Sequence, residues 1–275
     1  DMPQELVTLG YLSDFVYRTE WAHTKGEVTA IRNSDEVVDY FDSDTVVSEI
    51  RPYQISEFVS TLRDRGNSNG TINRKLAALS KMLTVAQRNE WIDTKPHIPR
   101  QKEPVHRIRW IDRDEELLMR ENSKDEMALL WSFLIDTGLR VGEALKLEYK
   151  DVDHKANRIR VWENKADKPR SVPMTTRVAE IVEPNGYDSG PFEYITQNRI
   201  TYEWNKMRKA MDLEEDSYFV PHICRHTFAS RLIQRGVGIT VVQQLCGHKT
   251  LDITLRYAHL APSNLDDAIL KLEEE

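Results

Sequence analysis

The apolar positions in the first third of the chain recur with helical spacing. Residues 52–65 place Ile55, Phe58, Val59 and Leu62 on one face, after a proline suited to the first turn and before a glycine, Gly66, suited to a C-terminal cap. Residues 71–90 repeat the pattern, with a predicted buried side of Ile72, Leu76, Leu79, Leu83 and Ala86. Two earlier helical stretches, near 4–20 and 24–42, complete a predicted helical domain over residues 1–93.

The pattern stops in a stretch rich in proline. Pro96, Pro99 and Pro104 forbid a continuous helix, and lysines and arginines are interleaved with them. We therefore predict an extended basic linker over residues 94–109. A second domain, residues 110–275, then opens at Asp112, which can cap a helix with Glu115 at capping-box spacing.

The second domain combines helices with a few short strands. Residues 125–139 predict an apolar helix that ends at Gly138. Residues 145–149, 158–162 and 170–173 alternate like strands joined by polar turns, and helical patterns return from 174. The predicted fold class is mainly α with a small antiparallel β-sheet.

Composition narrows the class of protein. The chain has 275 residues and only two cysteines, Cys224 and Cys246, which excludes a disulfide framework and favours small core residues in a reducing cytoplasm. No apolar run approaches the length of a membrane span and no secretory signal is visible, so neither a membrane partner nor export is expected.

The net charge of −7 argues at first against a nucleic-acid partner, but the charge is unevenly distributed. Residues 51–109 carry 12 Lys and Arg against 5 Asp and Glu, between acidic flanks. Within them a basic residue recurs every seven positions along one face of a predicted helix. Two of the linker arginines are added to the predicted DNA-binding set. The predicted DNA-binding residues are Arg74, Lys81, Arg88, Arg107 and Arg109. The alternative for the stripe is a solvated helix face.

Three further spacings carry candidate chemistry. Arg140 follows the predicted glycine helix end and precedes Glu143 by three residues. His222 and Arg225 share one helical face, and Gly247-His248 is followed nine residues later by Tyr257. Lys165 lies in the turn between the last two predicted strands.

Together these side chains suit the transesterification of a phosphodiester. Arginines can clamp the charged non-bridging oxygens, and histidines can add donors where other enzymes use Mg²⁺. A tyrosine hydroxyl, with a pKa of about 10, becomes a nucleophile when a base or cationic surroundings favour the phenolate. The departing 5′ oxygen needs a proton, which a lysine or histidine can supply.

Each element also has a plainer interpretation. Arg140 and Glu143 can form a surface ion pair, Lys165 can be an ordinary turn residue, and Tyr257 can serve in packing. A zinc site at the histidines and cysteines near 222–226 and 246–248 is disfavoured, because ligands two residues apart on a helix face different directions. We therefore expect no metal and no other cofactor.

The joint set resembles the tyrosine recombinase family of phage-type integrases. The motifs are Thr-Gly-Leu-Arg-x-x-Glu at 137–143, His-x-x-Arg-His-Thr-Phe-Ala at 222–229, Leu-x-Gly-His-Lys at 245–249 and Tyr-Ala-His at 257–259. The resemblance is sharp over about 125–260, and residues 4–92 resemble the core-site DNA-binding domain of that family. It implies a C-shaped clamp around double-stranded DNA. A separate N-terminal arm-binding domain is not visible here.

The resemblance also implies residue roles. The catalytic set would be Arg140, Lys165, His222, Arg225, His248 and Tyr257, with the tyrosine as nucleophile, the arginines and His248 on the phosphate, the lysine as acid and His222 in proton transfer around the tyrosine. The C-terminal residues Leu265, Ile269 and Leu272 form an apolar stripe. This stripe would link a DNA-bound homo-tetramer by exchange between protomers, or else pack on its own domain.

Site-specific recombination is the function that these features favour. Two alternatives share part of the evidence: a type IB topoisomerase-like relaxase with the same chemistry, and a DNA-binding regulator that keeps the fold without activity.

Overall fold

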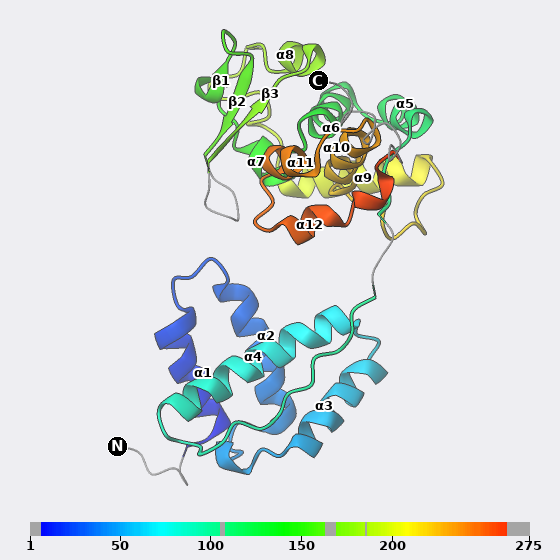
Figure 1. Ribbon diagram of the computed structural model, residues 1–275. Coiled ribbons are helices and arrows are strands. Elements are labelled where there is room, and N and C mark those ends of the chain that lie inside the picture. Colours follow the sequence, from blue (N-terminus) through cyan, green and yellow to red (C-terminus); the bar gives the residue numbers. More distant parts are fainter. Residues whose placement is uncertain (1–6, 105–107, 163–168, 185, 263–275) are drawn as a thin grey trace, which may run out of the picture. The chain divides into compact units, whose positions relative to one another are not determined.

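The computed structural model describes residues 7–104, 108–162, 169–184 and 186–262 (Figure 1). The chain divides into two compact units, residues 1–106 and 107–275. Each unit has its own apolar core, and the two are described separately. The C-shaped clamp therefore stays a prediction.

The first unit is a bundle of helices. Its elements are α1 (Leu9–Val16), the π-helical turn η2 (Tyr17–Trp21), α2 (Glu27–Phe41), the 3₁₀ turn η3 (Val47–Glu49), α3 (Pro52–Asp64) and α4 (Asn69–Arg88). The predicted buried faces of α3 and α4 are confirmed, since every residue named for them is buried. Pro52 begins α3, and Gly66, with φ of 79°, follows its end. Both ends of this helix were therefore predicted correctly from the sequence.

The proline-rich segment has no helix or strand, and it is hydrogen-bonded to the first unit. The side chain of Asn73 on α4 donates to the carbonyl of Gln101 at 2.8 Å and accepts from its N–H at 2.8 Å. Asn69 donates to the carbonyl of Lys102 at 2.7 Å, and Lys95 donates to Ser80 at 2.7 Å. Residues 94–104 thus belong to the surface of the first unit. Prolines exclude a helix but leave other backbone groups free to bond side chains of a neighbouring helix.

The second unit packs helices against one small sheet. Its helices are α5 (Arg113–Glu121), α6 (Asp125–Thr137), α7 (Val141–Leu145), α8 (Thr176–Ile181), α9 (Gln197–Ala210), α10 (Ile223–Gln234), α11 (Ile239–Cys246) and α12 (Leu251–Leu255), with 3₁₀ turns η4 (Tyr149–Asp151) and η5 (Ala258–Leu260). The antiparallel sheet has the order β1 (Val152–Asp153), β2 (Arg158–Val161) and β3 (Arg170–Pro173), in which Ile159 pairs with Val172. The predicted fold class is confirmed.

One predicted strand is wrong. Residues 145–149 contain the end of α7 and the start of η4, and the first strand is only Val152–Asp153. The alternation of Leu145, Leu147 and Tyr149 resembles a strand because period two and a short helix followed by a turn cannot be separated over five residues. By contrast, the capping box of α5 is confirmed: the N–H of Glu115 donates to Asp112 at 2.8 Å and the N–H of Asp112 donates back at 3.1 Å.

The core of the second unit lies around α6, α9 and the sheet. Trp131 and Trp204 meet edge to face at 4.9 Å between ring centroids. A separate buried cluster joins α10, α11 and the chain after α12, and it contains Phe228, Cys246 and Tyr257. Both cysteines are buried, as predicted. In the described part of the chain, no helix is long and apolar enough to cross a membrane.

Candidate active site

Two helices of the second unit end at glycines with left-handed backbones, and both ends point to one arginine. Gly138 closes α6 and Gly247 closes α11, each with φ of 64°. Space as well as dihedral angle demands glycine: a Cβ on Gly138 would lie 2.3 Å from Cδ1 of Phe228, and one on Gly247 would lie 2.9 Å from Cδ of Arg170. These turns present the backbone carbonyls of Gly138 and Cys246 to the guanidinium of Arg225.

Arg225 is the deepest cation of the site. It is 2% exposed. One of its amino groups donates to the carbonyl of Gly138 at 2.6 Å, and the other donates to the carbonyl of Cys246. Burial, with the nearby charges of Arg140 and Arg170, lowers its pKa to about 10. With this pKa the guanidinium is charged at pH 7, its two carbonyl partners carry no charge, and the carboxylate of Glu143 offsets part of the burial.

Arg140 stands at the start of α7 and is held by Glu143. The N–H of Arg140 donates to Glu143 at 2.8 Å, and its guanidinium donates to the same carboxylate at 3.0 Å. Arg170 of β3 makes two further hydrogen bonds to Glu143, at 3.0 and 2.7 Å, and donates to the carbonyl of Leu245 at 3.1 Å. Burial opposes ionisation of Glu143, but these partners lower its pKa. Arg170 therefore ties the sheet to both α7 and α11.

Tyr257 is buried, and its hydroxyl meets a histidine. The hydrogen bond between Tyr257 Oη and His226 Nδ1 is 2.6 Å long, and the tyrosine is 3% exposed. Burial raises the pKa of Tyr257 to about 12, although the charges of Arg225 and Arg256 oppose the shift. Burial, reinforced by His222, Arg256 and Arg225, lowers the pKa of His226 to about 4. At pH 7 the pair is a neutral phenol beside a neutral imidazole.

Two more histidines complete the surroundings of the tyrosine. The ring of His248 lies parallel to that of Tyr257 with centroids 6.4 Å apart, and its Nδ1 is 2.9 Å from Oγ1 of Thr254. Burial, then the charges of Arg225 and Arg140, lowers the pKa of His248 to about 3. His222, exposed at the start of α10, lies edge to face with His226 at 4.8 Å. The structure thus gathers four of the predicted residues, Arg140, Arg225, His248 and Tyr257, with His222 one ring further out.

Two predicted site residues lie outside the described residues. These are Lys165 and Arg107. The strands that flank the first of them, β2 and β3, are described, and β3 begins with Arg170 beside Glu143. Among the described residues there is no group of three or more His, Cys, Asp or Glu side chains able to hold a metal ion.

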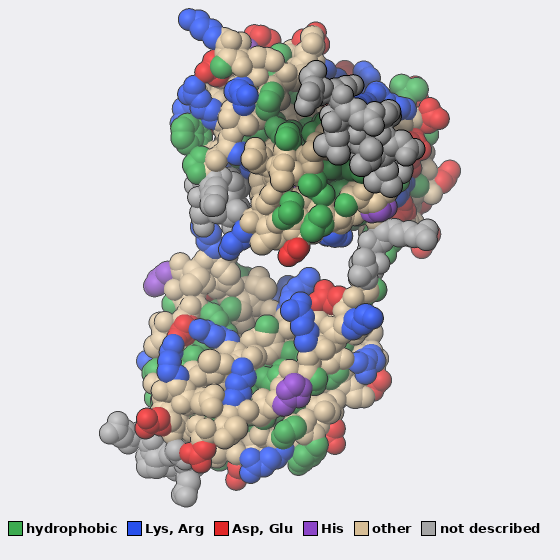
Figure 2. All heavy atoms as spheres, in the orientation of Figure 1, with side chains coloured by type: hydrophobic (Ala, Val, Ile, Leu, Met, Phe, Trp, Pro, Cys, Tyr) green, Lys and Arg blue, Asp and Glu red, His purple; other side chains and the backbone are tan. Residues whose placement is uncertain are grey.

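The predicted DNA-binding residues have three different environments. Arg74 is exposed on α4. Lys81 and Arg88, further along the same helix, both pair with Glu20, at 2.7 and 2.5 Å. Figure 2 shows Lys and Arg side chains spread over the face of the first unit that carries α4. The three cations share one helix, but two of them are already paired with the carboxylate of Glu20.

Arg109, which was also predicted to contact DNA, is bound by side chains of the second unit. It donates to Glu115 at 2.8 Å and to Asp216 at 3.0 Å, and its guanidinium lies 5.3 Å from the ring centroid of Phe219. The hydrogen bonds that it donates to Glu115 raise its pKa despite the burial. Arg109 therefore links α5 to the segment before α10 through two carboxylates and an aromatic ring.

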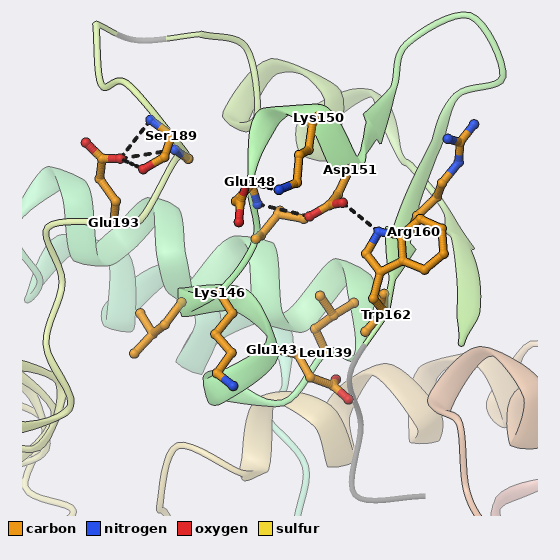
Figure 3. Close-up of a pocket in the computed structure, with 14 residues that line it drawn as sticks. Leu139, Glu143, Lys146, Glu148, Lys150, Asp151, Arg160, Trp162, Ser189 and Glu193 are labelled. Carbon is orange, nitrogen blue, oxygen red and sulfur yellow. Dashed lines mark hydrogen bonds and ion pairs between the residues drawn. The ribbon is translucent and has the colours of Figure 1, made fainter. Parts of the chain in front are cut away.

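A pocket of about 470 Å³ lies beside α7, on the side of Glu143 that faces the sheet (Figure 3). Its polar side chains are largely paired with each other: Trp162 donates to Asp151 at 2.6 Å, and Lys150 pairs with Glu148 at 2.5 Å. We assign it no ligand.

Two residues of the site were not predicted from the sequence. His226 sits inside the quoted motif and Arg170 inside a predicted strand, but neither was given a role. A signal existed for His226, because it follows Arg225 directly and lies one helical turn from His222. For Arg170 no local signal existed, since its partners come from positions 143 and 245.

The site brings together a tyrosine hydroxyl on a neutral histidine and a buried arginine that donates to two carbonyls, a set that is chemically able to transfer a phosphodiester to tyrosine. Residues 109–264 match the phage integrase family, and the chain belongs to this family of tyrosine site-specific DNA recombinases. Among curated relatives, the integrase of Escherichia phage P2 is 27% identical over 85% of this chain and 68% of its own length. A tyrosine recombinase of Pseudothermotoga lettingae is 29% identical over 85% of this chain and 86% of its own.

Solved structures share the fold of the chain. The Tn1549 transposon integrase, solved in complex with a circular intermediate DNA, has a TM-score of 0.79 at 18% identity, covering 98% of this chain and 99% of its own. The XerH recombinase, solved bound to its difH substrate, has a TM-score of 0.68 at 19% identity, covering 99% and 97%.

Proposed function

We propose that Tyr257 attacks a DNA phosphodiester and leaves a 3′-phosphotyrosine and a free 5′ hydroxyl. The hydrogen bond between its hydroxyl and a neutral histidine supports this role, because the imidazole that holds the phenol can also accept its proton. Since the phosphotyrosine preserves one phosphoester, rejoining to a new strand requires no ATP.

The cations of the site are assigned to the phosphate. Arg225 has a charge that its two carbonyl partners do not compensate, and a non-bridging phosphate oxygen would supply the missing negative charge. Arg140 and His248 add donors from the two glycine-ended turns, and Glu143 with Arg170 keeps those turns together. Lys165, in the segment between β2 and β3, is assigned to protonating the leaving 5′ oxygen, and His222 to proton transfer around the tyrosine.

The partner is double-stranded DNA, and we propose that both units contact it. The exposed Arg74 and the neighbouring cations of α4 support a backbone contact by the first unit, since phosphate contacts need local positive potential and not a positive net charge. For the whole assembly we propose a homo-tetramer on DNA in which residues 262–275 link protomers. Deleting these residues should then impair synapsis more than binding to a single site, whereas equal loss of both would count against the linkage.

Covalent capture on a suicide substrate tests the function. The substrate is a duplex that carries the chain's own recombination site, found as inverted repeats beside its gene, with a nick just beyond the scissile phosphate. The short fragment with the 5′ hydroxyl diffuses away, so a covalent protein–DNA adduct accumulates without added metal or ATP. Tyr257→Phe should abolish the adduct and leave DNA binding intact. Absence of an adduct with the unmodified chain would remove the proposal.

A further inference from the structure

We propose that His226, and not His222, directly accepts the proton of Tyr257 as its hydroxyl attacks the phosphorus. The inference rests on the function proposed above. It assigns the nucleophile's proton to a residue for which the sequence motif alone suggested no role. The observation that carries it is the 2.6 Å contact between Tyr257 Oη and His226 Nδ1.

The placement of His226 prepares it for this step. It projects from α10 one residue after Arg225, so one helix carries both a phosphate-clamping residue and the proton acceptor. Its ring centroid lies 5.9 Å from that of Tyr257 and 4.8 Å from that of His222. His222 is the outer ring of the pair and the exposed one. A proton taken up at Nδ1 of His226 therefore has a second imidazole beside it on the way to solvent.

The step balances as a single displacement. A bond forms between Tyr257 Oη and phosphorus, the bond between phosphorus and the 5′ oxygen breaks, and the phenolic proton moves to Nδ1 of His226. The leaving 5′ oxygen receives its proton from a separate acid. In rejoining, the 5′ hydroxyl attacks, and the imidazolium of His226 returns its proton to the departing phenolate.

The surroundings decide when the proton moves. The pKa values of about 12 for Tyr257 and about 4 for His226 lie far apart, so the proton stays on the phenol until the attack. The charged and titratable groups around this pair are His222, His248, Arg225 and Arg256, and the thiol of Cys246 acts on the tyrosine. Bond formation to phosphorus lowers the basicity of the phenolic oxygen, which makes transfer to a weak base feasible only in the transition state.

Matched variants separate the two histidines. His226→Asn keeps a side-chain oxygen close to the position of Nδ1 and so retains a hydrogen bond, but an amide cannot take the proton. Loss of a general base costs on the order of 100-fold or more in rate. For the nicked duplex we therefore expect His226→Asn to form adduct about 100-fold more slowly than wild type at pH 7. Its rate should rise about tenfold per pH unit between pH 6 and 9, where the rate of wild type is flat.

Two further arms isolate the nucleophile. A substrate with sulfur in place of the bridging 5′ oxygen has a leaving group that needs no proton, so it replaces the need for the acid but not for the base. The rate of adduct formation by His226→Asn should therefore stay low on this substrate. His222→Asn, the matched control, should lack the steep pH dependence. If His226→Asn kept the wild-type rate and flat profile, or if the slope appeared in His222→Asn instead, the assignment would be overturned.

A second variant guards against misfolding and gives an independent readout. His226→Ala leaves a space next to the tyrosine hydroxyl, and added imidazole should accelerate its adduct formation in proportion to the neutral form of the base. No acceleration in a folded His226→Ala protein would also refute the inference. All arms compare variants with a wild-type chain that forms adduct, so failure of the wild type itself counts against the proposed function and is seen separately.

Discussion

Replacing Gly138 by alanine perturbs the active site through its scaffold and not through a catalytic side chain. Its φ of 64° costs an alanine about 1–2 kcal/mol, since the left-handed region brings Cβ against the following carbonyl. The new Cβ would also meet the ring of Phe228 at 2.3 Å, which forces a shift in a packed region at a cost of about 1–3 kcal/mol. The expected destabilisation is therefore about 2–5 kcal/mol.

Gly236→Ala provides the matched control. Gly236 follows α10 in the same unit with φ of 77°, but no atom lies within 4 Å of the point that an added Cβ would occupy, so only the backbone cost of about 1–2 kcal/mol applies. Equilibrium urea unfolding of the full chain, followed by tryptophan fluorescence, measures both variants. Because both glycines belong to residues 107–275, the same unfolding transition reports on each.

The two variants should also differ in activity. The carbonyl of Gly138 accepts from Arg225 at 2.6 Å, so a shift of this turn misplaces the buried guanidinium. Loss of one positioned donor lowers catalytic rates by about 100-fold or more. We expect slower adduct formation on the nicked duplex for Gly138→Ala and a near-normal rate for Gly236→Ala. Equal stability losses in the two variants, or full activity of Gly138→Ala, would refute the reasoning.

Three other outcomes follow from charges in the structure. His226 and His248 have depressed pKa values of about 4 and about 3, whereas a histidine in the unfolded chain has a pKa near 6.5. Their contribution to stability is therefore fully present above about pH 6.5 and is lost as the pH falls, because the unfolded chain then binds protons that the folded chain does not. Melting temperature should fall as pH drops from about 6.5 towards 4, and His226→Asn should flatten this fall; an unchanged slope would contradict it. Arg74→Ala should lower the salt dependence of DNA binding by about one unit, whereas Arg109→Ala should lower the melting temperature and leave that slope unchanged, as an anisotropy titration against salt would reveal. Glu20→Gln should tighten binding to a non-specific duplex by up to about fivefold, because it frees two cations of α4 from an exposed ion pair; the same gain in the control Asp14→Asn, which breaks a separate pair with Arg18, would point to net charge alone.

The helices were readable from the sequence because their signals are local. The faces of α3 and α4, the glycine ends of α3 and α6, and the capping box of α5 each depend on residues within one or two turns. The strand predicted at 145–149 failed because so short a segment supports two periodicities. The hydrogen bonds of the segment 94–104 could not be predicted, because its partners, Asn69 and Asn73, lie about thirty positions earlier.

The site residues also differ in whether their signals are local or depend on distant partners. Arg225, His248 and Tyr257 were found from spacing, but nothing near Arg109 announced that Asp216 would bind it from 107 positions away. We propose the direct proton-accepting role for His226, and the sequence could not distinguish it from His222 for a related reason. Which of two histidines on one helix face meets a hydroxyl 31 residues later depends on how α10 packs against the chain after α12, and periodicity alone does not contain that information.

The charges of the site explain why cleavage would depend on bound DNA. From their pKa values, the buried tyrosine is protonated and His226 and His248 are neutral at pH 7, and Arg225 donates to two neutral carbonyls. On the proposed function, a phosphodiester bound by Arg225 would bring one negative charge into surroundings of low dielectric, where it would stabilise the guanidinium and favour protonation of the histidines. Both changes act in the direction that cleavage requires, since the phosphate oxygens gain a clamp and the phenolic proton gains a better acceptor. The substrate would thus supply the negative charge that the site lacks, and a phenol with a pKa of about 12 would stay unreactive towards other electrophiles until a phosphate is bound.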